Sequence, residues 1–221
     1  MFVNFKNIID SFHPKMPFGM AQIGKAFRNE ITPRDFIFRV REFEQMEIEY
    51  FIKGEDWEAQ FDYWKDEMIE WMTEIGLDLD MIHELEVPKE DLAHYSKRTV
   101  DFEFDFPFGK KELFGLAYRT DFDLGNHMKA SGESLEYAEE EGRVRFIPHV
   151  IEPTFGVERA LLALLVSSFR EEGEGDSARA YLKFSPKIAP VICAVSPLLR
   201  NKEALTDKAR EVFGMLKTEF G

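Results

Sequence analysis

The sequence predicts an α+β protein in which helices flank an antiparallel sheet. Residues 99–106 alternate between apolar aromatic and acidic side chains over most of their length, and residues 111–118 return after Gly109, which is the pattern of a β-hairpin. Residues 56–75 place tryptophan, phenylalanine and methionine at spacings of three and four, which is typical of an amphipathic helix. A sheet with a helix packed against it follows from these two patterns.

The segment from residue 26 to residue 52 is predicted as a strand, a loop and a second strand. The turn is placed at residues 32–35, because proline fixes φ and aspartate can bond its own backbone. After the helix over 56–75, residues 77–97 are expected to be irregular or to hold short helices. Strand periodicity puts the following side chains on one face of the second strand: Arg39, Arg41, Phe43, Gln45 and Glu47.

In the second half of the chain, a loop, a strand and a buried helix are predicted in that order. Residues 125–142 are polar and indicate a loop, and residues 143–151 indicate a strand. Gly156 is expected to begin a helix that is apolar nearly all round and should therefore be buried. Residues 173–176 are predicted as a surface loop.

The last part of the chain, from residue 187, is predicted to begin an α/β unit. Residues 191–195 form an apolar run that is expected to be a short buried strand, and an amphipathic helix should follow over about 202–220. Cys193 lies in this run, so we expect a buried structural thiol. Because it is the single cysteine, no internal disulfide can form, which fits a reducing cytoplasm.

Composition and charge limit the classes of function. Apolar residues make up 44% of the 221 residues, which is enough for a substantial core, and no apolar run is long enough to span a membrane. The first six residues lack the order of a signal peptide. The formal net charge of −14 argues against nucleic-acid binding, but four arginines crowd into one stretch. Such a cluster suggests a polyphosphate ligand in a pocket, or alternatively a solvated strand face. The four are Arg28, Arg34, Arg39 and Arg41.

Common catalytic signatures are absent from the sequence. There is no Walker A loop, no G-x-G-x-x-G, no H-E-x-x-H and no C-x-x-C pair. The histidines do not have the spacing of metal ligands, so we expect them on the surface or in packing. They are His13, His83, His94, His127 and His149.

The most informative stretch is Phe27-Arg28-Asn29-Glu30, followed after the turn by Arg39-x-x-x-Phe43-x-x-x-Glu47. Strand positions four apart point the same way, so one surface offers a guanidinium, a ring and a carboxylate, and the antiparallel partner adds Arg28 and Glu30. An aromatic ring can stack on adenine, a carboxylate or backbone group can bind its amino edge, and guanidinium groups can clamp phosphates. The pattern predicts a nucleotide site suited to charge stabilisation at an α-phosphate.

This stretch resembles motif 2 of class II aminoacyl-tRNA synthetases, and Thr154-Phe155-Gly156-Val157-Glu158-Arg159 resembles their motif 3. Residues 26–34, 43–47, 119–124 and 152–156 closely resemble glycyl-tRNA synthetases of the homodimeric type, and the likeness runs over nearly the whole chain. The resemblance implies the class II antiparallel sheet. It also implies a glycine–tRNA ligase, which activates glycine with ATP and Mg²⁺ to glycyl-adenylate and transfers it to tRNA(Gly).

The resemblance implies a role for each matching residue. Arg28 and Arg159 would be catalytic, Phe43 would stack on adenine, and Glu112 is a candidate magnesium contact. The ATP site would comprise Arg28, Asn29, Glu30, Phe38, Arg39, Val40, Arg41, Glu42, Phe43, Glu112, Leu113, Gly156, Val157, Glu158 and Arg159. The glycine site would comprise Phe43, Glu44, Gln45, Met46, Glu47, Glu152, Pro153, Thr154, Phe155 and Gly156.

The resemblance also implies how the chain is divided and where it departs from the family. Residues 1–186 would be the catalytic core, with an insertion at about 53–110, and residues 187–221 would be the first strand and helix of an anticodon-binding domain. Motif 1 and an Arg-Pro-Glu-Thr segment are expected to lie outside the chain, so the homodimer is expected for the full-length family and poor tRNA charging for this chain alone. Thr154 stands where serine is expected. The alternative is a non-catalytic synthetase-like fragment that binds tRNA or a protein.

Overall fold

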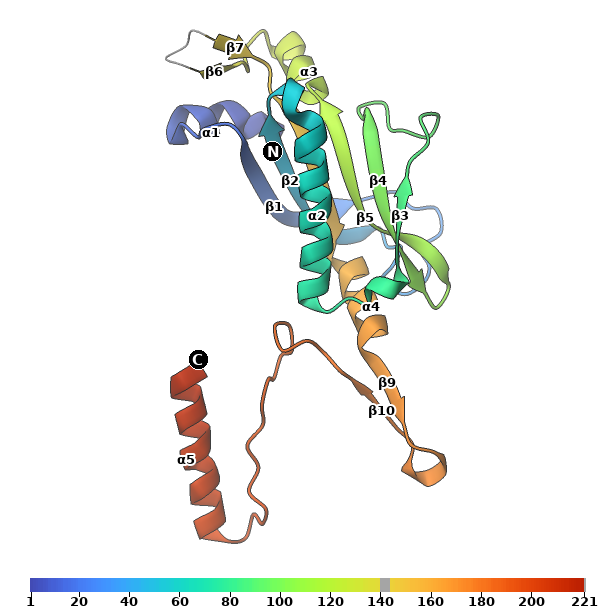
Figure 1. Cartoon of the computed structure of the whole chain (residues 1–221), viewed down its shortest axis with the longest axis vertical. Helices are drawn as coiled ribbons and strands as arrows, with labels where there is room; N and C mark the ends of the chain where they lie inside the picture. The colour runs from blue at the N-terminus through green and yellow to red at the C-terminus, as the bar shows by residue number, and fades with distance from the viewer. Residues whose placement is uncertain (140–143, 221) are drawn as a thin grey trace. The chain divides into compact units, whose positions relative to one another are not determined.

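The computed structural model describes residues 1–139 and 144–220, and the chain divides into two compact units, Met1–Lys183 and Phe184–Gly221. The first unit is built on an antiparallel sheet with the strand order β1-β2-β8-β5-β4-β3 (Figure 1). Its strands are β1 (Phe18–Phe27), β2 (Glu42–Ile52), β3 (Ile82–Glu86), β4 (Arg98–Phe106), β5 (Gly109–Thr120) and β8 (His149–Gly156). The expected antiparallel sheet flanked by helices is confirmed.

Helices and two short hairpins complete the described chain. The helical segments of the first unit are η1 (Phe2–Asn4), α1 (Phe5–Phe12), η2 (Gly54–Asp56), α2 (Trp57–Ile75), η3 (Leu79–Met81), α3 (Phe122–Ser131), α4 (Val157–Ser168) and η5 (Gly175–Ser177). The hairpins pair β6 (Tyr137–Glu139) with β7 (Val144–Phe146), and β9 (Phe169–Glu172) with β10 (Arg179–Leu182). The second unit contains α5 (Glu203–Phe220). Among the described residues, the helices are all too short or too polar to cross a membrane.

The main core lies between the sheet and α2, which Figure 1 shows running along the strands. Phe61, Met68 and Met72 of α2 are buried against every second residue of the strands beneath them. Val100, Phe102 and Phe104 are such residues, so the predicted alternation of β4 and the helical repeat over 56–75 are both confirmed. The intervening residues of the strands face the other side of the sheet, where they are free to form a site.

A smaller core closes one end of that other face. Phe5 of α1, Phe51 of β2 and Leu124 of α3 are buried together there. The rings of Phe5 and Phe51 lie 4.7 Å apart. The N-terminal helix and α3 therefore cap the sheet beyond the point where its polar side chains lie.

Two turns depend on glycine at positive φ. Gly76 ends α2 at φ 89°, and its N–H bonds back to the carbonyl groups of Met72 and Thr73. Gly109 has φ 110° in the β4–β5 hairpin, which confirms the predicted turn.

The structure corrects the predicted turn before β2. The tight turn lies at residues 35–38 and not at 32–35, because Arg34 and Arg39 exchange two backbone hydrogen bonds across it. Asp35 and Phe36 both have positive φ, of 59° and 54°. Since β2 begins only at Glu42, Arg39 precedes the strand and belongs to the loop.

Two segments, one predicted as irregular or short-helical and one as a loop, contain regular elements in addition to the short helix η3. Residues 82–86 form the edge strand β3, which pairs with β4. Residues 125–131 of the predicted loop all belong to α3, which is anchored by the fully buried Leu124 and by an ion pair between Arg119 and Asp123. The predicted strand over 143–151 is interrupted between β7 and β8, and Arg143 lies outside the described residues, as do residues 140–142 of the predicted loop.

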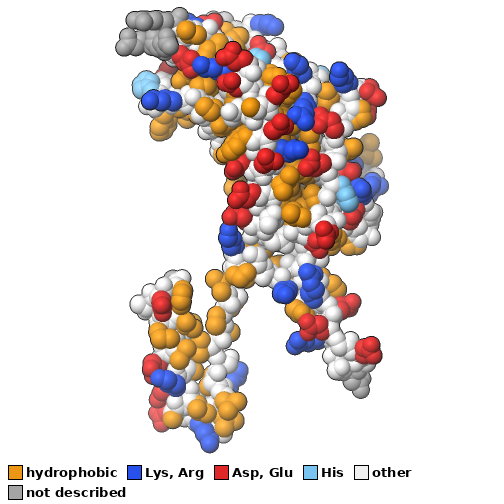
Figure 2. Space-filling model, viewed as in Figure 1, with side chains coloured by type: hydrophobic (Ala, Val, Ile, Leu, Met, Phe, Trp, Pro, Cys, Tyr) orange, Lys and Arg blue, Asp and Glu red, His pale blue; other side chains and the backbone are white. Residues whose placement is uncertain are grey.

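Burial predictions for the two C-terminal apolar runs are also corrected. Helix α4 is only partly buried, because Ala160 and Ala163 face the core while Leu161 is 49% exposed. Residues 191–195 do not form a strand, Val191 and Ile192 are exposed, and Cys193 is exposed rather than a buried thiol. An apolar strand is buried only when neighbours cover it, and the described residues of the second unit bring none to this run. The helix α5 confirms the amphipathic prediction, and Figure 2 shows hydrophobic side chains on its surface.

Candidate active site

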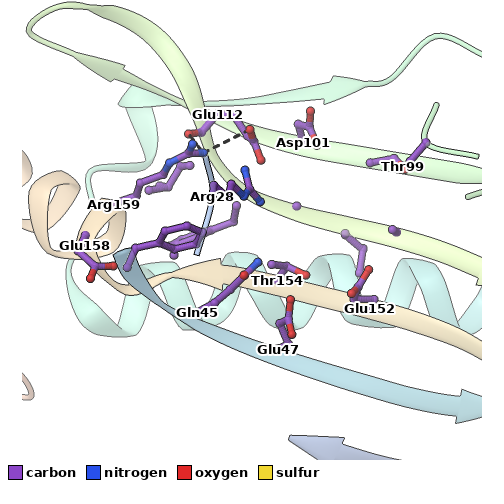
Figure 3. Close-up of a pocket in the computed structure, with 18 of the residues that line it drawn as sticks. Arg28, Gln45, Glu47, Thr99, Asp101, Glu112, Glu152, Thr154, Glu158 and Arg159 are labelled. Atoms are coloured by element: carbon purple, nitrogen blue, oxygen red, sulfur yellow. Dashed lines mark hydrogen bonds and ion pairs between the residues drawn. The ribbon is translucent and has the colours of Figure 1, made fainter. Parts of the chain in front are cut away.

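A cavity of about 450 Å³ lies on the face of the sheet opposite α2. Its walls are the polar-face residues of β2, β4, β5 and β8, the start of α4, and the loops before β2 and before β4. Figure 3 shows Arg28, Arg159 and Glu112 near one end and Glu47 and Glu152 further along. The cavity is lined by these residues of the sequence-predicted site: Arg28, Glu30, Phe38, Arg39, Val40, Phe43, Gln45, Glu47, Glu112, Leu113, Glu152, Thr154, Gly156, Glu158 and Arg159.

Arg159 is fixed at the start of α4. Its Nη1 donates to the carbonyl oxygen of Glu112 at 3.0 Å and lies 3.3 Å from that residue's carboxylate, while Nε reaches the carbonyl oxygen of Phe38 at 3.4 Å. The guanidinium carbon lies 4.4 Å from the centre of the Phe38 ring. Three elements that are far apart in sequence thus hold one cation at the cavity wall.

The neighbouring Glu158 ties α4 to β2. Both of its carboxylate oxygens accept the backbone N–H of Glu44, at 2.9 and 3.0 Å. Glu44 thereby contributes through its backbone, because its side chain faces away from the cavity as strand alternation requires. This contact fixes the angle at which Arg159 enters the site.

Arg28 and Phe43 stand together on the hairpin formed by β1 and β2. Their positions follow from the register, in which Ala26 pairs with Phe43 and the N–H of Arg28 bonds to the carbonyl of Arg41. The guanidinium of Arg28 lies 5.3 Å from the centre of the Phe43 ring. In the loop beyond, Arg39 lies 3.6 Å from a carboxylate oxygen of Glu30. The expected convergence of guanidinium groups and an aromatic ring is therefore present in one cavity.

Carboxylates gather at the other end of the cavity. Glu47 of β2 pairs with Thr154 of β8, and Glu152 follows two residues away on the same face. Glu152 accepts from Nη1 of Arg119 at 2.7 Å, and Arg119 also holds Asp123 through two bonds of 2.8 and 2.9 Å. Burial raises the pKa of Glu152 above its ordinary value, and the Arg119 guanidinium opposes that shift. The arrangement favours a small cationic group.

The remaining residues of the predicted site, all within the described part of the chain, do not line the cavity. Met46 and Phe155 face the α2 core because they occupy the alternate positions of their strands. Arg41 turns its Nε to the carbonyl oxygen of Glu30 at 3.0 Å. The full set outside the cavity lining is Asn29, Arg41, Glu42, Glu44, Met46, Pro153, Phe155 and Val157.

Sequence reasoning did not assign several residues that line the cavity. Thr99 and Asp101 lie on the polar face of β4, so the alternation marked their side of the strand but not the cavity above it. Arg119 belongs to the segment 119–124 that carries the family resemblance, but the sequence assigned it no role in the site. Tyr95 comes from a segment with no periodic signal, and its ring centre lies 3.9 Å from the Arg119 guanidinium.

Asp101 is half-buried beside the Arg159 end. Burial, with the nearby Glu112 carboxylate, raises the pKa of Asp101 to about 6 from 3.8. The folded protein therefore holds this proton more tightly than the unfolded chain does. Ionised Asp101 destabilises the fold above pH 6, and this effect disappears as the pH falls below about 4.

We expect Asp101→Asn to raise the melting temperature by an amount that grows between pH 4 and pH 7, because the uncharged amide escapes the penalty of ionisation. Thermal unfolding followed by circular dichroism across this range checks the prediction. Asp10→Asn, at an exposed position on α1, is the control and should show no such trend. A shift of the same size at every pH would contradict the assignment.

The described residues contain no cluster of three or more His, Cys, Asp or Glu side chains placed to hold a metal ion alone. Glu112 and Asp101 nevertheless put carboxylate oxygens on the cavity wall beside the guanidinium groups. Oxygen donors are what Mg²⁺ prefers, and it commonly binds through one or two carboxylates together with phosphates of a substrate. The donor set therefore fits a magnesium ion that arrives with a nucleotide.

The sequence profile of the tRNA synthetase class II core domain (G, H, P, S and T) matches residues 4–168. The chain belongs to this family. The class II core thus covers the whole six-stranded sheet, the loop that carries Arg39, and α4, which are the elements that build the cavity.

Curated relatives of this class II chain carry the name glycine–tRNA ligase. The protein of Thermus thermophilus is 49% identical over 229 aligned residues, which are 96% of this chain and 45% of the relative. The protein of Clostridium tetani is 49% identical, and the alignment covers 100% of this chain and 47% of the relative. The protein of Cutibacterium acnes is 47% identical, and the alignment covers 98% of this chain and 48% of the relative. The chain spans about half the length of the curated relatives it matches.

Proposed function

We propose that the chain carries the adenylate-forming site of a glycine–tRNA ligase, which activates glycine with ATP and transfers it to tRNA(Gly). The observation that supports this most strongly is that one cavity holds arginine and aromatic side chains at one end and carboxylates at the other. Arg28, Arg159 and Phe43 offer a seat for a nucleotide at one end, and Glu47 and Glu152 offer carboxylates at the other. The relatives' names agree with this combination.

In the proposed reaction, a carboxylate oxygen of glycine attacks the α-phosphorus of ATP, the bond from that phosphorus to the β-phosphate oxygen breaks, and pyrophosphate leaves. Arg28 would stabilise the negative charge that develops between the two reactants, and Arg159 and Arg39 would hold the outer phosphates. Phe43 would carry the adenine ring on its face. Glu112 and Asp101 would hold magnesium, which neutralises phosphate charge when bound.

The carboxylate end supports glycine as the amino acid. Thr154 lies between Glu47 on β2 and Gly115 on β5 in the sheet register, so its side chain occupies the floor of this end. Glu47 and Glu152 would bind the ammonium group, and the threonine would limit the space left for a side chain. The additional methyl group, relative to the serine expected from the resemblance, narrows this space further.

We extend the proposal to the partners and setting that the resemblance implies. The acceptor would be tRNA(Gly), the compartment the cytoplasm, and the full-length enzyme a homodimer. The residues from 187 onward would form the beginning of an anticodon-binding domain. This proposed start is three residues after Phe184, where the second compact unit begins.

We expect the purified chain to exchange radiolabelled pyrophosphate into ATP when glycine is added, and not when alanine or serine is added. The reason is that the carboxylates require an ammonium group while Thr154 leaves little room beyond it. Thr154→Ser should retain glycine-dependent exchange, since it keeps the hydroxyl and relieves crowding. A folded chain that shows no exchange with glycine would instead favour a non-catalytic synthetase-like protein, and equal exchange with alanine would contradict the amino-acid assignment.

A further inference from the structure

Glu49 is a buried acid next to the proposed ammonium site, and the reaction proposed above leaves it without a role. It follows Glu47 by two positions on β2, so strand alternation places both side chains on the cavity face of the sheet. Glu49 is only 3% exposed and lies beyond the cavity, towards the small core that contains Phe51. Its Oε2 has no hydrogen-bond partner among the described residues.

Glu49 stands opposite Glu152 in the sheet. The β2–β8 register pairs Glu47 with Thr154 and Tyr50 with Ile151, which brings residues 49 and 152 to the same level between these pairs. Side chains directly opposite on antiparallel strands have Cβ atoms roughly 5 Å apart, and like charges placed there repel. Both carboxyl groups are buried, so little water screens them.

The charges around this pair do not balance if every acid is ionised. The charged groups that face Glu49 are Glu47 on its own strand, Glu152 on β8, Arg119 on β5 and Asp123 on α3. Arg119 commits Nε and Nη2 to Asp123 and Nη1 to Glu152. One guanidinium thus serves two carboxylates by direct bonds, and within the described part of the chain no cation is in direct contact with Glu49.

The titration of Glu49 agrees with this geometry. Burial raises the pKa of Glu49 to about 8, with a further increase from the Glu152 carboxylate and a smaller opposing effect of Arg119. Because Glu152 has its own bond to Arg119, which favours its ionised form, the geometry favours Glu49 as the site of a shared proton.

We propose that Glu49 and Glu152 share one proton at neutral pH, carried by Glu49, and that this proton leaves to solvent when an ammonium group binds beside Glu47 and Glu152. This inference rests on the proposed function, because it takes glycine as the occupant of that end of the cavity. Glu49 is then a positioning residue. As a neutral acid it relieves repulsion on Glu152 while the site is empty, and as a carboxylate it adds attraction once the cation is present.

The consequence is that glycine affinity depends on pH in a range where the amino group of free glycine stays protonated. If binding releases one proton, the association constant rises by up to about tenfold per pH unit below the pKa of the free pair. Glu49→Gln keeps the shape of the neutral acid but has no proton to release. We expect it to bind glycine with an affinity that changes less than about twofold between pH 6.5 and pH 8.

Isothermal titration calorimetry of the 221-residue chain with glycine, in two buffers of different ionisation enthalpy at pH 7, measures the released proton. We expect about one proton per glycine for the unaltered chain and for Glu58→Gln, an exposed control on α2, and close to none for Glu49→Gln. Proton release that persists in Glu49→Gln, or binding without release in the unaltered chain, would overturn this inference and leave the proposed function intact. No glycine binding by the folded chain would overturn both.

A second measurement needs no variant. Carbon-13 NMR of labelled glutamate side chains in the unaltered chain should show one carboxyl that is still protonated at pH 7, and added glycine should move its titration to lower pH. If every glutamate carboxyl is already ionised at pH 6 without ligand, the inference is wrong even where Glu49→Gln fails to fold.

Discussion

Arg159→Ala is expected to lower the rate of glycine-dependent pyrophosphate exchange by about 10²–10³, which is the typical cost of removing one preorganised group that stabilises charge in a transition state. The guanidinium is held by the carbonyl oxygens of Glu112 and Phe38 and by the Phe38 ring, so it needs no rearrangement when phosphate charge develops. Steady-state exchange assays at saturating ATP and glycine measure the effect.

Two further variants separate loss of chemistry from loss of fold. Arg159→Lys keeps the positive charge and the aliphatic stem but loses the planar fork, so it should retain more activity than the alanine variant. Arg170→Ala removes an exposed arginine just beyond α4 and should leave the exchange rate unchanged. The role of Arg159 would be refuted if the alanine variant, folded by circular dichroism, exchanged at the original rate.

Arg119→Ala is expected to lower the free energy of unfolding by about 3–5 kcal/mol, because it leaves buried carboxylates without their counterion. Asp123 and Glu152 both lose direct bonds to the guanidinium, and Tyr95 loses the cation against its ring. For a chain of this length, such a loss corresponds to a fall of roughly 6–20 °C in melting temperature. Thermal and urea unfolding measure both quantities.

The matched control for Arg119 is Arg145→Ala. Arg145 is exposed on β7, so its removal should change the free energy of unfolding by no more than about 0.5 kcal/mol. If the two alanine variants unfolded at the same temperature, the network around Arg119 would contribute little to stability, and the electrostatic account of the carboxylate end would fail with it.

The parts of the fold that could be predicted from the sequence are those specified by local periodicity. The phenylalanine alternation of β4 and the aromatic repeat of α2 both report which face packs against the core, so their type and approximate limits follow from the sequence alone. The helix end at Gly76 and the hairpin turn at Gly109 could also be predicted, because a positive φ is a local requirement that glycine meets without strain.

Elements that depend on distant partners could not be predicted. The edge strand β3 carries mixed side chains and is ordered by pairing with β4. Helix α3 contains Gly125 and polar residues, and it is anchored from outside by Arg119 and by burial of Leu124. Conversely, the apolar run around Cys193 was wrongly predicted as a buried strand, because hydrophobicity alone does not show whether a neighbouring element covers the run.

The cavity residues likewise divide into those that local sequence patterns predict and those that depend on distant partners. Strand spacing placed Phe43, Gln45 and Glu47 on one surface, the antiparallel partner strand added Arg28, and the motif resemblance added Arg159. Asp101, Tyr95 and Arg119 reach the cavity only through the register of β4 against β5 and through a loop with no periodicity. Glu49 was indistinguishable in sequence from its exposed acidic neighbours, because its burial results from the packing of α1 and α3 over that end of the sheet.

A structure of the chain with a non-hydrolysable glycyl-adenylate analogue would show whether this cavity is the adenylate-forming site. We expect the adenine ring to lie on Phe43, the group that replaces the α-phosphate to lie within hydrogen-bond distance of Arg28, and the glycyl ammonium to lie between Glu47 and Glu152. An analogue bound with its ammonium away from these two carboxylates, or bound outside the cavity on this face of the sheet, would contradict this assignment.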